Sequence, residues 1–262
     1  VGNEGKLSHS RANFFPNFTL RGMTLGYLFS QRNRAIIEKE KDGGDYEVAE
    51  RRDHGPVFAL NLPMFGGIFK VGASATYLMR RELNKSFEST EVVEINDKED
   101  FKSGKGLFIT AGARLTLPVT ALPTLAAVLR NATQNDWEDV SGEDPANPRI
   151  GPSLMRQTLD VGFSLTPQIS KITRLHFEIN FKDLNNSYDT DSKRRMAAGM
   201  ELDFNRRIFL RAGYGDGWGS GGIGVRSRTF IFDFTTYAVD RSLDGFRKDE
   251  DRRFVLSVSS GI

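Results

Sequence analysis

The sequence predicts an all-β protein: a transmembrane antiparallel up-and-down β-barrel of about twelve strands, within a range of about ten to fourteen. Three observations predict this fold. Apolar and polar residues alternate along most of the 262 residues, the connections are short and long in turn, and no segment has the roughly 18 consecutive apolar residues of a spanning helix. We expect one barrel domain over residues 1–262, with 1–15 as a periplasmic N-terminal segment.

The alternation is clear in 174–182, where Phe177 and Ile179 are separated by polar residues. Successive side chains of a strand point to opposite faces, so this segment has one apolar and one polar face. The first strand is less regular, because Arg21 falls on the face that carries Met23, and the ninth and tenth can be read as one bent strand. In chain order, we predict strands over roughly 17–31, 55–63, 67–80, 105–118, 122–131, 154–166, 172–183, 194–205, 208–215, 219–227, 229–239 and 252–262.

The connections between these strands alternate in length. The links 32–54, 81–104 and 132–153 are long and charged, whereas 64–66 and 119–121 are short. Alternate links of a meander lie at the same end, so one end carries short turns and the other long loops. Outer-membrane barrels have this asymmetry, with short periplasmic turns and long extracellular loops. An even strand number would place both termini at the short-turn end.

The composition limits the function classes. Lys and Arg number 36 against 34 Asp and Glu, a net charge of +2 that is too balanced to predict a nucleic-acid partner. Cysteine is absent, which excludes disulfides, thiolate metal sites and a cysteine nucleophile. The three histidines are scattered, so we expect no metal and no cofactor. The first residues, 1–4, have no apolar signal-peptide region, as expected if the numbering begins at or after a mature N-terminus.

Alternation alone leaves open which face is outward. A soluble β-sandwich or a lipocalin-like barrel would bury the apolar face. The even strand count, the repeated loop asymmetry, and a polar face that mixes both charge signs with glycines favour the membrane barrel. The charged residues (with one histidine) that we predict to face the lumen are Lys70, Arg80, Arg114, Arg156, Asp160, Arg174, His176, Glu178, Lys182, Glu201, Asp203, Arg211, Arg226, Asp233 and Arg253. Those predicted to face lipid are Phe69, Val71, Tyr77, Leu107, Ile109, Leu115, Phe163, Phe177, Ile179, Phe181, Phe204, Phe230, Phe232, Phe234, Phe254 and Leu256.

A series of short motifs adds a family resemblance. They are LPTLAAVLRN at 122–131, HFEINFKDL at 176–184, AGMEL at 198–202, FLRAGY at 209–214, GIGV at 222–225, FDF at 232–234 and RRFVLS at 252–257. Their order resembles the C-terminal half of the FadL-like outer-membrane barrels, closest to the PorV-type and TraF-type branch, over roughly 120–262. The chain departs from that pattern in lacking the N-terminal hatch with its Asn-Pro-Ala motif and in ending at Ile262 rather than at an aromatic residue.

The resemblance implies a barrel in a Gram-negative outer membrane, inserted by the barrel-assembly machinery. FadL-like members take up hydrophobic compounds, and PorV-like members are partners in protein secretion. We therefore expect a non-enzymatic barrel of transport or porin-like type. The alternative is a structural or accessory barrel with a closed, charge-filled lumen that anchors or partners a larger envelope or secretion complex.

The predicted lumen can be interpreted in two ways. Its nine positive and five negative residues predict an anion-preferring pore, because rings of Arg and Lys select anions. In a narrow, dry barrel the same charges would instead pair and fill the interior.

Three segments invite a chemical interpretation that we do not favour. His176, with Glu178 and Asp160, has no nucleophile in a suitable pattern, so we expect no enzyme. The oxygen-rich loop 183–191 lacks EF-hand spacing and is interpreted as a solvated turn. The glycine-rich 213–222 joins two strands rather than a strand and a helix, so it is not a phosphate loop.

The expected partners are outer-membrane lipid and lipopolysaccharide. The acidic loops 81–103 and 132–153 would face outward, where they could bridge divalent ions to lipopolysaccharide or bind a cationic surface. Other envelope proteins are further candidate partners.

Overall fold

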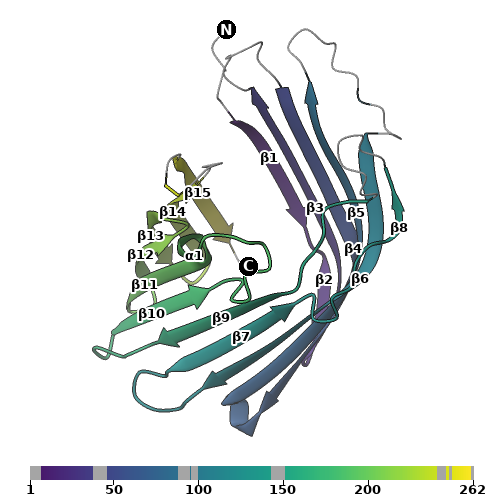
Figure 1. Cartoon of the computed structure of the whole chain (residues 1–262). Coiled ribbons are helices and arrows are strands. Elements are labelled where there is room, and N and C mark those ends of the chain that lie inside the picture. The colour runs from purple at the N-terminus through teal and green to yellow at the C-terminus, as the bar shows by residue number, and fades with distance from the viewer. Residues whose placement is uncertain are drawn as a thin grey trace. The chain divides into compact units, whose positions relative to one another are not determined.

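The structure is a computed structural model and is all-β (Figure 1). It describes residues 7–37, 46–87, 95, 100–142, 151–240, 246–247 and 250–260. In this part of the chain, one antiparallel sheet holds 15 strands, accompanied by one four-residue α-helix and one 3-10 turn. The centres of the predicted acidic loops, and Ile262, lie outside the described residues.

The elements follow one another along the chain with few interruptions. The first nine are β1 (Leu7–Phe14), β2 (Asn17–Leu20), β3 (Met23–Ile37), β4 (Tyr46–Met64), the 3-10 turn η1 (Phe65–Gly67), β5 (Phe69–Phe87), β6 (Phe101–Thr116), β7 (Thr124–Arg130) and β8 (Glu138–Ser141). The others are β9 (Thr158–Leu165), β10 (Thr173–Phe181), α1 (Ser192–Arg195), β11 (Met196–Phe204), β12 (Ile208–Gly215), β13 (Trp218–Arg226), β14 (Phe230–Asp240) and β15 (Glu250–Ser260).

The strand order is that of a meander. It runs β1-β3-β4-β5-β6-β7-β9-β10-β11-β12-β13-β14-β15, while β2 also pairs with β3 and β8 with β6. The chain falls into two compact units, which we describe separately. Unit 1 comprises Val1–Asn61, Gly72–Thr110 and Asn131–Arg156, and unit 2 comprises Leu62–Val71, Ala111–Arg130 and Gln157–Ile262.

The N-terminal predictions are wrong in two respects. Residues 7–14, which the strand prediction places before the first strand, form β1 and pair with β3. The predicted strand 17–31 is a hairpin of β2 and β3, whose turn is Arg21-Gly22, with Gly22 at a φ of 73°. The irregular position of Arg21 therefore has a simple cause: it lies in the turn, where the alternation is interrupted. Pro16 separates β1 from β2, because proline has no N–H for the ladder.

The additional N-terminal strand changes the strand count and the position of the N-terminus. The predicted twelve strands become fifteen, of which thirteen lie in the meander order. Leu7 pairs with Ile36 near the end of β3, so β1 begins at the long-link end of unit 1 and not at the short-turn end. Among the described residues no ladder joins β1 to β15, so the predicted closed barrel is seen only as an open strand order.

The predicted asymmetry of the connections is largely present. Five links are short: η1 and residues 117–123, 166–172, 205–207 and 227–229. The intervening links are long, except that β12 and β13 are joined by Asp216-Gly217 alone, with both residues at positive φ. The long link between β10 and β11 contains α1, and the link between β7 and β9 contains β8.

The strand register of unit 2 aligns the apolar residues into rows across the sheet. One row crosses six strands through Leu115, Leu125, Phe163, Ile179, Ala198 and Tyr214. Another crosses β11 to β15 through Leu202, Leu210, Ile223, Phe234 and Leu256. No second layer covers these side chains in the described part of unit 2: Leu125, Ile179 and Leu256 are 52%, 54% and 61% exposed.

A search of the described residues for a membrane-spanning helix gives none of sufficient length and apolarity.

Candidate functional site

The polar face of unit 2 is organised around Arg211 on β12. Its Nε donates to Glu201 Oε2 on β11, and its Nη1 donates to Asp233 Oδ1 on β14, both at 2.6 Å. Glu201 is the direct ladder partner of Arg211, whereas Asp233 lies two strands away. All three side chains remain about one-third exposed. The arginine is therefore neutralised by two carboxylates, each through a charge-assisted hydrogen bond.

Glycine makes this reach across β13 possible. A Cβ on Gly224 would lie 2.5 Å from Asp233 Oδ1 and 3.2 Å from Arg211 Nη1. The absent side chain therefore leaves the space that the ion pair occupies. Phe209 is buried on the same face, and the guanidinium carbons of Arg211 and Arg226 lie 5.6 and 5.3 Å from its ring centre.

Next to this ion pair, small residues leave a trough in the polar face. Two adjacent rows of ladder partners cross it. One runs Glu178, Gly199, Gly213 and Ser220, and the other runs Asn180, Ala197, Gly215 and Trp218. Tyr237 of β14 also lines the trough. We call the hollow over Ala197, Gly199, Gly213, Gly215 and Ser220 the unit-2 trough. It encloses about 630 Å³, within the size range of small-molecule sites.

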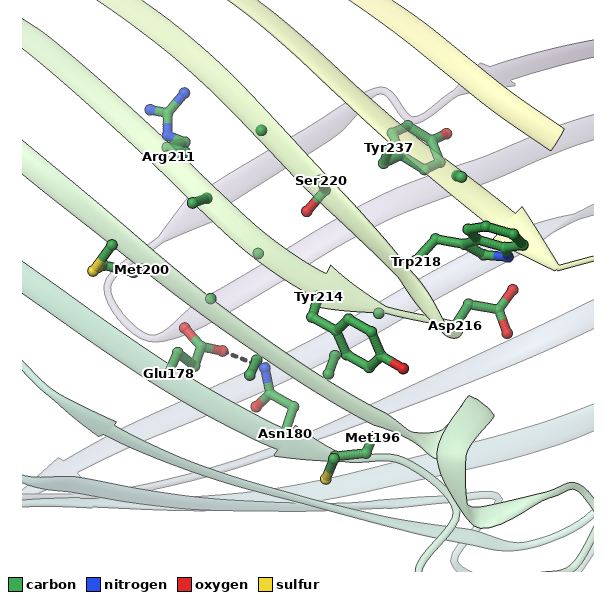
Figure 2. A pocket seen from close by; sticks show the side chains of 18 of the residues that line it. Glu178, Asn180, Met196, Met200, Arg211, Tyr214, Asp216, Trp218, Ser220 and Tyr237 are labelled. Carbon is green, nitrogen blue, oxygen red and sulfur yellow. Dashed lines mark hydrogen bonds between the residues drawn. The ribbon is translucent and has the colours of Figure 1, made fainter. Parts of the chain in front are cut away.

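The two long edges of the trough differ in character. Figure 2 shows Glu178 and Asn180 on one side and Trp218 and Tyr237 on the other. The polar edge comes from β10 and the aromatic edge from β13 and β14. Three ladder steps of about 4.8 Å separate the backbones of Asn180 and Trp218, so the trough is about 14 Å wide between backbones. A ligand here would meet hydrogen-bonding groups on one side and rings on the other.

The polar edge is internally satisfied. Asn180 Nδ2 donates to Glu178 Oε1 at 2.6 Å, and His176 Nε2 lies 3.3 Å from Glu178 Oε2. The other ring nitrogen of His176, Nδ1, lies 2.8 Å from the hydroxyl of Thr166. Thr166 is a contact that sequence reasoning missed, because it comes from the neighbouring strand end.

These contacts follow the order nucleophile, base and orienting acid, with Thr166, His176 and Glu178 in the three places. Acyl transfer also needs donors for an oxyanion. The N–H of Thr166 is already bonded to Ala121 O at 2.5 Å, and that of Leu175 to Pro167 O at 3.0 Å. Neither of these two N–H groups is therefore available to an oxyanion.

The short helix α1 closes one end of the trough. Asp191 caps it by accepting from Lys193 N at 2.8 Å. Arg195 Nη1 donates to the carbonyl of Asp183 at 2.7 Å. The Asp183 carboxylate in turn accepts from Ser187 N and Tyr188 N, which orders the loop 183–191. In the described part of the chain, no cluster of three or more acidic or histidine side chains could hold a metal ion.

Three donors without a hydrogen-bond or ion-pair partner in the described part of the chain lie at this end of the trough. Two buried nitrogens, Arg195 Nε and Trp218 Nε1, have no hydrogen-bond partner. Lys182, which follows β10, is exposed and has no ion-pair partner among the described residues. Of these three donors, Lys182 is the one open to solvent, because the two nitrogens are fully buried.

The polar face of unit 1 is packed rather than hollow. The link between β7 and β9 folds onto it. The ring of Trp137 meets that of Phe108 edge to face, and the guanidinium carbon of Arg80 lies 4.9 Å from the centre of the Trp137 ring. Arg80 is 3% exposed and donates to both carboxylate oxygens of Asp53, at 2.7 and 3.0 Å. Trp137 Nε1 bonds Ser153 O at 2.9 Å, which ties the two described parts of the link together.

The predicted lumen-facing residues separate into three groups. The register places on the polar face of unit 2 Arg114, Asp160, Arg174, His176, Glu178, Glu201, Asp203, Arg211, Arg226, Asp233 and Arg253. Arg80 is instead buried in unit 1, and Lys70 is half-buried in β5. Arg156 and Lys182 lie outside the strands, because β9 begins at Thr158 and β10 ends at Phe181.

The predicted lipid-facing residues also have defined places. The register places on the apolar face of unit 2 Leu115, Phe163, Phe177, Ile179, Phe181, Phe204, Phe230, Phe232, Phe234, Phe254 and Leu256. Tyr77 and Leu107 are exposed, and Phe69, Val71 and Ile109 are half-buried. Whether the two faces meet lipid and a lumen stays a prediction.

Sequence reasoning missed three aromatic residues of the polar faces: Phe209, Tyr237 and Trp137. For Phe209 and Tyr237 the signal was present, because both fall on the polar side of the period-two pattern. For Trp137 no local pattern indicates that its link folds onto the sheet.

A comparison of the sequence with protein-family models gives no match, and a comparison with curated proteins gives none either. The resemblance to FadL-like barrels therefore remains a prediction from the motifs alone.

Proposed function

We propose that this chain is a non-enzymatic, transport-type β-barrel of a Gram-negative outer membrane, with its apolar face against lipid and its polar face along an aqueous passage. One observation carries the proposal: the exposed apolar row that runs without interruption from Leu115 to Tyr214. A water-soluble sheet covers such a row with a second layer. An uncovered row of this length is instead typical of strands that face lipid.

The polar face of unit 2 supports the aqueous side of the proposal. Its charges are paired across strands, yet Arg211 and Glu201 remain 34% and 33% exposed. In a dry interior these ion pairs would be fully buried and would bear the desolvation cost of both charges. The observed exposure indicates that the pairs keep contact with water. Mixed-sign pairs that are one-third exposed suit a surface that borders water.

Closure of the barrel has a specific requirement. The meander order holds thirteen strands in antiparallel succession, so β1 and β15 run in the same direction. Direct closure would pair them in parallel, while antiparallel closure would require one further strand. Odd strand numbers occur among membrane barrels.

A second candidate function is a structural or accessory barrel that partners an envelope complex. The observation in its favour is the packed polar face of unit 1, where Arg80 is buried under Trp137. A link that fills the interior would prevent conduction. The unit-2 trough favours transport over this alternative, because it leaves the polar face of unit 2 hollow.

Conductance of the refolded chain in a planar bilayer, at two salt gradients, tests the proposal. We expect steady single-channel conductance with anion preference, and Arg114→Glu should reduce that preference because Arg114 is exposed on the polar face of β6. Arg228→Glu, in the β13–β14 turn, is the matched control and should have a smaller effect. Insertion without conductance would contradict transport and favour the accessory barrel. A chain that stays soluble without detergent would contradict both.

A further inference from the structure

We propose that the unit-2 trough binds a small organic anion, with its acidic group beside Lys182 and Arg195 and its flat body over the glycine floor. This inference deepens the proposed transport function and rests on it for its physiological role, since it names the class of solute that the polar face would take. Binding itself is a property of the trough and can be measured without transport.

The charge balance of the trough carries the first step. Its carboxylates already have partners: Glu201 accepts from Arg211, Glu178 accepts from Asn180, and Asp216, which also lines the trough, has a partner too. The groups without partners are donors, namely the Lys182 ammonium, Arg195 Nε and Trp218 Nε1. A cationic ligand would find no free carboxylate among these groups. A carboxylate or another acidic group would pair with Lys182, which is the exposed donor of the three.

The position of the cations gives the second step. The backbone N–H of Lys182 donates to the backbone carbonyl of Arg195 at 2.9 Å, so the two residues are held side by side at the α1 end of the trough. Arg195 is fixed further by the bond from its Nη1 to the carbonyl of Asp183. One cation is thus pre-organised, and the other is free to close on a ligand. Lysine supplies a flexible point charge for an acidic group, and arginine a planar, always charged donor.

The floor gives the third step. Main chain and small side chains form it, and the rings of Trp218 and Tyr237 border it (Figure 2). A flat, unsaturated body can lie against peptide planes and contact both rings, as aromatic contacts favour. The aromatic rings border one long edge of the trough, and the cations lie at its α1 end. An anion with a planar body could therefore place its acidic group at the cations and its body against the rings.

Gly199 offers a direct way to fill the trough. It lies in the floor between Glu178 and Gly213, and a Cβ placed on it would come no closer than 4.0 Å to the nearest atom, Ala212 O. A larger side chain here projects into the hollow without a backbone clash. Gly112 is the matched control: it lies on the polar face of β6, away from the trough, and a Cβ there would make only ordinary contacts, at 3.4 Å.

The test is calorimetric titration of the full refolded chain in detergent micelles with benzoate, and with benzamide as its neutral counterpart. Heats from micelles without protein are subtracted. We expect benzoate to bind at least about tenfold more tightly than benzamide, because one charge-assisted contact is lost in the amide. Lys182→Gln should weaken benzoate binding by about tenfold. Lys193→Gln, on the exposed side of α1 outside the trough, should not change it.

Filling the trough with a larger side chain gives a second test, which does not depend on charge. Gly199→Phe should abolish binding of both compounds, and Gly112→Phe should leave it unchanged. Equal affinity for benzoate and benzamide, or unchanged binding in Gly199→Phe, would overturn the inference. Failure of benzoate to bind to a chain that conducts ions would overturn only this inference. Specific binding to a chain that does not conduct would support the inference and contradict the proposed transport.

Discussion

Arg211 bonds Asp233 at 2.6 Å across an intervening strand. The two residues belong to β12 and β14, and the guanidinium passes over β13 at Gly224. The bond thereby joins β12 and β14, which share no backbone ladder in the described sheet. The same residue also bonds Glu201 on β11, so one arginine joins β11, β12 and β14.

This relationship predicts that Gly224→Ala destabilises the protein. The new Cβ would lie 2.5 Å from Asp233 Oδ1, and the ion pair must shift to admit it. We expect a loss of about 1–3 kcal/mol in the free energy of unfolding, typical of an overpacked site. Guanidinium unfolding of the chain refolded in lipid vesicles measures it.

Gly219→Ala is the control for this variant. It lies on the same strand, and a Cβ there would come no closer than 4.0 Å to the nearest atom, Gly213 O. The free energy of unfolding should change little. An equal loss in both variants would show that glycine flexibility, and not the space above Gly224, stabilises this part of the sheet.

The sequence predicted the strands of unit 2 better than those of unit 1. Predicted 208–215 is β12, and predicted 229–239 differs from β14 by one residue. The alternation is regular there, and short turns mark its ends. In unit 1, a turn at Arg21-Gly22 was read as strand, and β8 was missed because its four residues, Glu138–Ser141, contain no alternation.

The trough could not be predicted from the sequence. Glycines are frequent throughout the chain, and only the register shows that Gly199 lies beside Gly213, with Ala197 beside Gly215 in the next row. Cross-strand neighbours depend on turn lengths that alternation does not define. The buried position of Arg80 was hidden for the same reason, since it requires a link to fold back over the sheet.

The buried pair of Arg80 and Asp53 predicts a large effect of single substitution. Asp53→Asn leaves the buried guanidinium of Arg80 without its ion-pair partner, so it should lower the free energy of unfolding by about 3–5 kcal/mol. Arg80→Met should cost less, because Asp53 keeps Arg51 as a partner at 3.1 Å. The double variant Arg80→Met with Asp53→Asn should lose less than the sum of the two single losses. Chemical denaturation of the four proteins in this cycle measures the coupling.

Arg52→Met is the control for the charge itself, because Arg52 is 46% exposed and its partner is the neighbouring Glu50. Its effect should remain below about 1 kcal/mol. Strictly additive losses in the Arg80 cycle would contradict the buried pair.

Trp137 predicts how the packed link affects conduction. Trp137→Ala removes the ring that lies between Phe108 and Arg80 and releases its bond to Ser153. If the link narrows the passage, single-channel conductance should rise in this variant. Val140→Ala, a substitution in β8 of the same link, where the side chain is 40% exposed, should leave it unchanged. Unchanged conductance in Trp137→Ala would mean that the link does not border the passage.

The apolar row predicts the effect of a charge on each face. Ile179→Arg would place a cation among the exposed apolar residues of β9 to β11, and we expect a loss of about 2–4 kcal/mol in vesicles, as for a lipid-facing arginine near the membrane centre. Ser164→Arg is the matched change on the opposite face, beside its ladder partner Glu178. It should cost less than about 1 kcal/mol. Equal losses would contradict the assignment of the faces.

The assignment of Phe163 and Ser164 to opposite environments tests the central claim most directly. The chain has no cysteine, so Phe163→Cys and Ser164→Cys each introduce one site for a nitroxide label. Power-saturation EPR of the labelled chain in phospholipid vesicles compares contact with oxygen, which concentrates in lipid, and with a water-soluble nickel chelate. We predict that the label at 163 meets oxygen and that at 164 meets nickel. Nickel contact at both positions, or the reverse order, would contradict a membrane barrel with an apolar outer face.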